Sequence, residues 1–207
     1  HPSLLPKYRG PTPAEWAILN GETETGITII KMSPEFDNGD ILEQKALSIN
    51  FGDTRETLYQ RLFDLGANML IDTLPKVSAR SDLADSQDQI FIKPRPQTGT
   101  PTHARRLSRE EGFIPWETLN AAIQGKPHPP TTLPSLLISQ LTTHNPLPVV
   151  IERAVRALAG WPGVWTTTPQ GKRLKIISVR LENSRLVPLV VQEEGGKPKP
   201  WKVCAEI

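Results

Sequence analysis

Proline is the feature of this sequence that most limits how the chain can fold. The 207 residues contain 21 prolines, and these concentrate between residues 94 and 148. Proline fixes its own φ and lacks the backbone N–H that helices and central strands use. We therefore expect a long irregular connection in this region, with one folded domain before it and a second, smaller one after it.

The residues before this connection predict alternating helices and strands. A short helix is expected to begin at Thr12-Pro13, because threonine caps helices well and proline suits the first helical position. Strands are predicted over residues 26–31 and 41–47, and leucines three and four residues apart predict a long helix over residues 53–77. This order is typical of the second half of an open α/β sheet.

The residues after the connection predict a smaller domain rich in strands. One short helix is expected over residues 117–124, and a second begins at Asn145-Pro146 and ends at Gly160. Runs of β-branched and apolar residues then predict a small sheet or barrel, with strands at 164–167, 174–179 and 186–191. A further short strand is possible at residues 90–92. We therefore divide the chain into domains at residues 1–92 and 146–207, joined by a proline-rich linker at 93–145.

Composition excludes several classes of protein. Hydrophobic residues make up 37% and charged residues 22%, as in a globular domain. The single cysteine, Cys204, cannot form an internal disulfide, and no apolar run reaches membrane-spanning length. The net charge is −4 for residues 1–77 and +6 for residues 78–207, so the second half is better suited to meet a polyanion. An ordinary basic surface is the alternative interpretation.

Two loops hold the residues best suited to chemistry. His1, followed by Pro2, opens a stiff loop that continues through Pro6, and Asp37 opens an Asp-Asn-Gly turn. Either residue alone has a structural explanation, since a lone histidine is usually structural and an aspartate often bonds its own turn. The sequence contains no HExxH, GxGxxG or P-loop pattern, so we expect no metal. The opening loop has the form of one that follows a strand, and we expect the chain to begin inside a fold.

The same loops carry a resemblance to a known family. The first forty or so residues resemble the 10-formyltetrahydrofolate-dependent formyltransferases in the runs HPSLLPKYRG at 1–10, WAI at 16–18, NGE at 20–22, TGIT at 25–28 and D-x-G-x-I-L at 37–42. The second half of the chain resembles, more sparsely, the members that act on methionyl-tRNA. The matching runs are LSREEG at 107–112, RAL at 156–158, WPG at 161–163, GK at 171–172 and E-G-x-K-P at 194–198. The sequence departs from this pattern over residues 117–148 and 177–192.

The resemblance implies a fold and a site. The expected fold is α/β, the second half of an open Rossmann-like sheet followed by a small OB-like β-barrel. The implied catalytic residues are His1 and Asp37, with an asparagine two residues before the histidine as a third. Ser3, Leu4, Leu5 and Pro6 match the segment that binds the folate co-substrate, 10-formyltetrahydrofolate.

The resemblance also implies binding partners, and it leaves alternative functions open. The expected acceptor is initiator methionyl-tRNA, with residues 146–207 binding the tRNA, in a monomeric protein of the bacterial cytoplasm, or of mitochondria in a eukaryote. A formyltransferase acting on an amino sugar nucleotide and a formyltetrahydrofolate hydrolase or dehydrogenase share the His-Pro-Ser-Leu-Leu-Pro and Asp-x-Gly segments. A third alternative is an inactive RNA-binding fragment.

Overall fold

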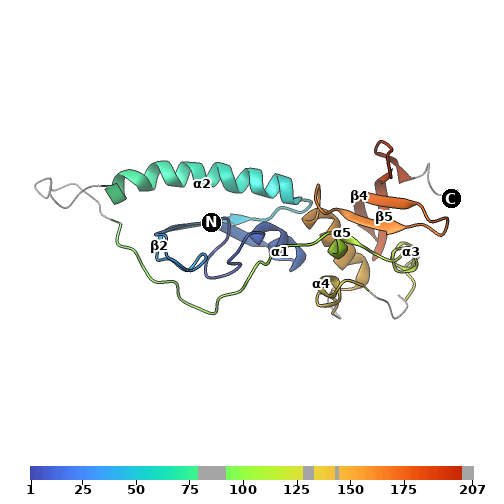
Figure 1. Ribbon diagram of the computed structural model, residues 1–207, viewed down its shortest axis with the longest axis horizontal. Coiled ribbons are helices and arrows are strands. Elements are labelled where there is room, and N and C mark those ends of the chain that lie inside the picture. The colour runs from blue at the N-terminus through green and yellow to red at the C-terminus, as the bar shows by residue number, and fades with distance from the viewer. Residues whose placement is uncertain (79–91, 128–132, 143–144, 202–207) are drawn as a thin grey trace, which may run out of the picture. The chain divides into compact units, whose positions relative to one another are not determined.

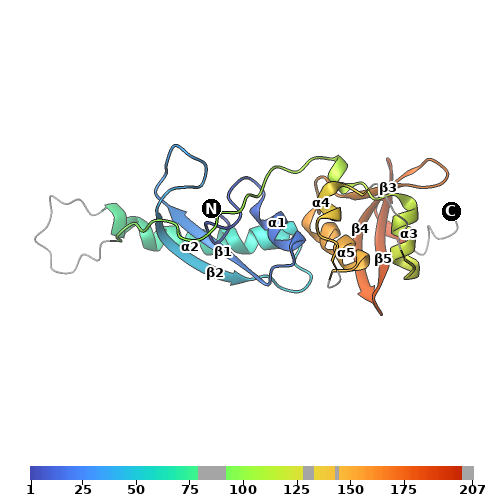
Figure 2. The ribbon, with the colours of Figure 1, turned by 90° about the horizontal axis from the view of Figure 1, so that it is seen from below.

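A computed structural model describes residues 1–78, 92–127, 133–142 and 145–201. Contacts divide the chain into two compact units (Figures 1 and 2). Unit 1 comprises most of residues 1–106, and unit 2 comprises residues 107–207 together with two short pieces from the first half, 18–21 and 54–56. The strand predicted at residues 90–92 lies largely outside the described residues.

Unit 1 is built on a β-hairpin covered by a helix. Strand β1 (Glu24–Ile30) pairs with β2 (Ile41–Ser48) in antiparallel register, from Glu24 opposite Ser48 to Ile29 opposite Glu43. The helix α2 (Arg55–Ser78) lies along this hairpin in both views (Figures 1 and 2). Its side chains Leu58, Leu62 and Met69 are buried, whereas Leu70 and Leu74 are 44% and 55% exposed, so only part of the face predicted from the three- and four-residue spacing packs. The short helix α1 (Pro13–Leu19) also lies where the sequence predicts it.

The proline-rich segment after α2 is not a free connection in its described part. Arg95 exchanges two backbone hydrogen bonds with Ile41 of β2, at 2.7 and 2.9 Å. Arg9 N donates to Thr102 O at 2.9 Å, and Ala104 N donates to Arg9 O at 2.7 Å. Residues 93–104 therefore run along unit 1 as an extended strap, with the prolines at positions whose N–H groups are not needed.

Unit 2 is a four-stranded antiparallel sheet with helices packed on it. The strand order is β3 (Val164–Thr167), β4 (Arg173–Glu182), β5 (Arg185–Glu193) and β6 (Lys199–Pro200). All three predicted strands are present. The β4–β5 turn has positive φ at both Asn183 and Ser184, which matches the right-handed twist of a two-residue hairpin.

The helices of unit 2 pack beside this sheet. They are η2 (Glu110–Gly112), α3 (Trp116–Gln124), α4 (Ser135–Ile138) and α5 (Leu147–Ala157). Helix α5 packs against β4 and β5, and α3 against β5. Gly125 closes α3 with a φ of 66°, as its position predicts. Helix α5 begins one residue later than the sequence predicts, because Pro146 rather than Asn145 is its N-cap.

Candidate active site

The first loop is tied to strand β1 by a buried threonine. Thr28 Oγ1 donates to Ser3 O at 2.6 Å and accepts from Leu5 N at 3.1 Å and from Gln44 Nε2 at 2.8 Å. Thr28 is fully buried, as is Ser3, whose hydroxyl donates to Lys7 O at 2.6 Å. The backbone of His1 also exchanges two hydrogen bonds with that of Thr28, both 2.9 Å long. The loop is therefore held at both ends of its first turn.

The second loop is held in a conformation that places one carboxylate. Asp37 has a φ of 50°, a region that aspartate tolerates better than most residues. Its Oδ2 accepts a hydrogen bond from Gly10 N at 2.8 Å. A Cβ at Gly39 would lie 1.7 Å from Lys31 O, so only glycine fits where this loop crosses the end of β1.

The two loops bring His1 and Asp37 together. His1 Nδ1 lies 3.4 Å from Asp37 Oδ1, with 8% and 22% of the two side chains exposed. This is the separation of an ion pair rather than of a short hydrogen bond. His1 Nε2 lies 3.0 Å from Tyr8 O, and since a carbonyl can only accept, Nε2 is the nitrogen that donates there. The imidazole is thus held on one edge and faces a carboxylate on the other.

Gln97 is a residue of this site that the sequence reasoning missed. Its Nε2 donates to Asp37 O at 2.8 Å and to Gly39 O at 2.9 Å. Its Oε1 accepts from the guanidinium of Arg9 at 2.6 and 3.2 Å. Gln97 therefore clamps the Asp37 loop to the first loop. A sequence signal existed in the Pro-x-Pro spacing around Arg95, which is typical of an edge strand as well as of a linker.

The residues predicted to hold folate lie in different surroundings. Leu5 is buried, with 3% of its surface exposed, while Leu4 and Pro6 are partly exposed. A hollow of about 330 Å³ opens beside Asp37, lined by Ile30 and residues 32–36. Among the four residues predicted to hold folate, Leu4 and Pro6 are therefore the ones whose side chains are open to a ligand.

Comparison with known proteins decides the family. Residues 1–74 match the family described as "Formyl transferase", and residues 148–199 match "Formyl transferase, C-terminal domain". The chain belongs to the formyl transferase family. It is 37% identical over 186 residues to a methionyl-tRNA formyltransferase of Roseiflexus castenholzii, an alignment that covers 89% of this chain and 47% of the relative. The chain spans about half the length of the curated relatives it matches.

Solved structures share the fold of this chain. A methionyl-tRNA formyltransferase from Clostridium thermocellum aligns with a TM-score of 0.58 at 19% identity, over 93% of this chain and 66% of that one. HypX from Aquifex aeolicus in complex with tetrahydrofolic acid aligns with a TM-score of 0.58 at 18% identity, over 100% of this chain and 34% of that one. These matches confirm the predicted α/β fold with a small β-rich second part.

Two further features were sought in the described residues. No helix within the described ranges is long and apolar enough to cross a membrane. Across those same ranges, no three His, Cys, Asp or Glu side chains gather as they would around a metal ion. His128, His144 and Cys204 lie outside the described residues, and the absence of a metal stays a prediction.

Proposed function

We propose that this protein serves formyl transfer from 10-formyltetrahydrofolate to the amino group of initiator methionyl-tRNA, in the bacterial cytoplasm. The observation that carries the proposal is the His1–Asp37 pair, held by two fixed loops at 3.4 Å in a chain of the formyl transferase family. The relative named above is a methionyl-tRNA formyltransferase at 37% identity, and this favours methionyl-tRNA over a sugar nucleotide as the acceptor.

The reaction sets three requirements for the site. The amine attacks the formyl carbon, a new C–N bond forms, and the bond between that carbon and N10 of the folate breaks. A negative charge develops on the formyl oxygen, and one proton must leave the attacking nitrogen while N10 gains one. A catalyst therefore needs a hydrogen-bond donor for the oxygen, a base for the amine proton and a route by which a proton reaches N10.

His1 and Asp37 fit those roles in this proposal. Nε2 of the ring donates to Tyr8 O, so the formyl oxygen would approach the Nδ1 edge, which also faces Asp37 Oδ1 at 3.4 Å. Asp37 stabilises positive charge on the ring, accepts the amine proton directly or through water, and returns a proton to N10 as the bond between N10 and the formyl carbon breaks. Gly10 N and Gln97 fix this carboxylate and its backbone, which lowers the cost of organising the site during the reaction.

The folate would bind beside this pair. Leu4 and Pro6 offer apolar surface, and the backbone of residues 3–6 offers hydrogen bonds, which is the mixture that a small-molecule pocket needs. HypX was solved with tetrahydrofolic acid bound, which supports a folate co-substrate. We further propose that residues 146–207 form the OB-like, tRNA-binding part of a monomeric enzyme.

The test is formyl transfer by the full-length protein and its His1→Ala variant. We expect the variant to lose at least about a hundredfold in kcat, the usual contribution of one positioned acid–base group, with tRNA affinity unchanged. An unchanged rate would refute the assignment. Offering an amino sugar nucleotide in place of methionyl-tRNA distinguishes the two acceptors, and faster formylation of the sugar would overturn the choice made here.

A further inference from the structure

One face of the sheet in unit 2 carries an aromatic ring and two cations side by side. In the strand register, Trp165 of β3 lies opposite Lys175 of β4, which lies opposite Gln192 of β5. Arg173 precedes Lys175 by two residues and therefore points to the same face, because side chains alternate along a strand. Leu174, between them, is buried. The Trp165 face is thus the polar face of the sheet.

The indole of Trp165 holds the Arg173 guanidinium. The guanidinium carbon lies 4.3 Å from the ring centroid, within the range of a cation–π contact. The indole is fixed from behind, since its Nε1 donates to Arg109 O at 3.3 Å and Phe113 packs against it at 4.7 Å. Within the described part of the chain, the guanidinium of Arg173 donates no hydrogen bond. A half-buried cation is therefore fixed in place while its donors remain available.

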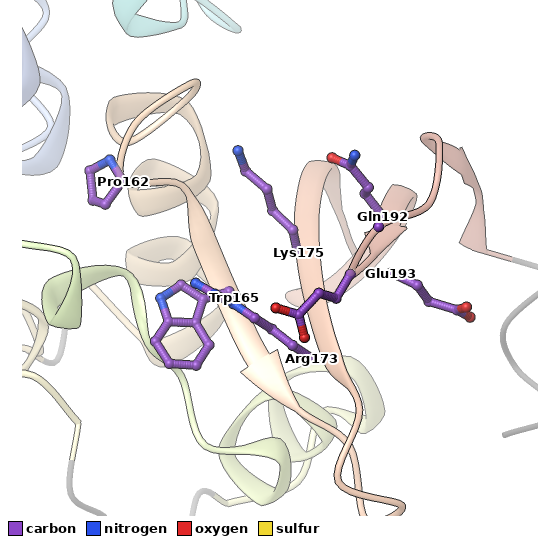
Figure 3. Close-up of a pocket in the computed structure, with 8 residues that line it drawn as sticks. Pro162, Trp165, Arg173, Lys175, Gln192 and Glu193 are labelled. Carbon is purple, nitrogen blue, oxygen red and sulfur yellow. The ribbon is translucent and has the colours of Figure 1, made fainter.

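A hollow of about 210 Å³ opens between these side chains (Figure 3). Pocket volumes for drug-sized ligands begin at about 300 Å³, so this one has room for a single flat group rather than a cofactor. Lys175 Nζ donates to Gly160 O at 3.0 Å, which leaves two of its N–H groups for a ligand. Of the two carboxylates that line the hollow, Glu193 is paired with Lys199 at 2.8 Å and Glu194 is exposed at the rim.

We propose that this hollow, the Trp165 site, binds one nucleotide of a single-stranded stretch of RNA. The base stacks on the Arg173 guanidinium that Trp165 supports, and Lys175 contacts the adjoining phosphate. Guanidinium planes and aromatic rings are the usual platforms for unstacked RNA bases, and cations beside them add the phosphate contact. The inference rests on the proposed function for the choice of RNA as ligand, and it names residues for that contact.

The test measures binding of a fluorescein-labelled single-stranded RNA of about ten nucleotides to the full 207-residue chain by fluorescence anisotropy. We expect Arg173→Ala to weaken binding about tenfold, the effect of losing one stacked base. Arg173→Lys keeps the charge but lacks the plane, so we expect it to bind nearly as weakly as the alanine variant. Lys175→Ala should lower the slope of log K against log salt by about one, as for one lost phosphate contact.

Arg180 provides the matched control. It lies on the same strand, its side chain is 57% exposed, and it pairs with Glu182 at 2.6 Å. We expect Arg180→Ala to change binding less than twofold. Equal effects of the two alanine variants, or full binding by Arg173→Lys, would reduce the Trp165 site to diffuse surface charge and overturn the proposal. If the wild-type chain binds RNA but the full-length protein has no formylation activity, the proposed function alone is refuted. If the activity is normal and Arg173→Ala binds RNA as well as wild type, the Trp165 site alone is refuted.

Discussion

Two buried threonines on strand β1 are expected to respond differently to substitution by valine: one substitution should lower the free energy of unfolding and the other should not. Thr28 Oγ1 takes part in three hydrogen bonds, to Ser3 O, Leu5 N and Gln44 Nε2. In Thr28→Val the shape is nearly kept, but two buried backbone groups lose their partner. Each buried group left without a partner costs about 1–3 kcal/mol. We expect Thr28→Val to lower the free energy of unfolding by about 2–6 kcal/mol for these two groups, with no further loss from Gln44, whose amide can turn toward water.

Thr25 provides the internal control. It lies on the same strand and is equally inaccessible, but its hydroxyl has no hydrogen-bond partner in the described part of the chain. Burying a hydroxyl without a partner costs about 1–3 kcal/mol on mutational scales. Thr25→Val should therefore leave the free energy of unfolding unchanged or raise it by about 1 kcal/mol.

Urea denaturation followed by circular dichroism measures both variants against wild type, provided that the m-value is unchanged. The two substitutions remove the same atoms from the same strand, so the difference between them isolates the hydrogen bonds. Equal effects would refute the reasoning, because the Thr28 hydroxyl would then contribute nothing specific to holding the first loop. A shared loss would indicate instead that β1 does not tolerate valine at either position.

Three further substitutions, two of them paired with a control substitution, test other parts of the molecule by the same denaturation measurement. Gln97→Ala removes the bonds to Asp37 O and Gly39 O and the contact with Arg9, and should cost about 2–3 kcal/mol; a loss below about 0.5 kcal/mol would show that the strap does not hold the loop. Gly39→Ala forces the loop off Lys31 O and should cost more than Gly171→Ala, which meets open space and loses only about 1–2 kcal/mol for its positive φ. Glu152→Ala removes the bidentate contact with Arg156, whose side chain is 17% exposed, and should cost more than Glu182→Ala at the exposed Arg180 pair, which should cost less than about 1 kcal/mol. Similar losses for these two glutamates would contradict the role given to burial.

The sequence predicts most of the regular elements because their signals are local. The long helix follows from leucine spacing, α3 ends at Gly125 as its position indicates, and the three main strands of unit 2 follow from β-branched runs. The β4–β5 turn was harder to place, since Asn183-Ser184 lacks the glycine that usually marks such a hairpin.

The candidate site was only partly predictable. His1 and Asp37 are 36 positions apart in the chain, and the family resemblance, rather than their spacing, is what pairs the two residues that lie 3.4 Å apart. Thr28 carries no comparable signal, and the Pro-x-Pro spacing around Arg95 indicates an edge strand near Gln97 but not the role of its side chain. A threonine in a strand and a glutamine among prolines are common, and their roles depend on backbone groups that approach from distant parts of the chain. Hydrogen bonds to the backbone leave no mark on the partner's side chain, so residue patterns cannot reveal them.

The strap has a practical consequence for exchanging parts between relatives. Residues 93–104 look like a tether, and a junction placed at residue 92 would seem harmless. Such a junction would place the donor protein's residue at position 97, and the hydrogen bonds that Gln97 makes to the Asp37 loop would then depend on that residue. A junction after Arg106, where unit 1 ends, carries Arg95, Gln97 and Thr102 along with the loops they bind. Chimaeric proteins joined at this later point should keep the geometry around His1, and those joined earlier should lose it unless the donor also has glutamine there.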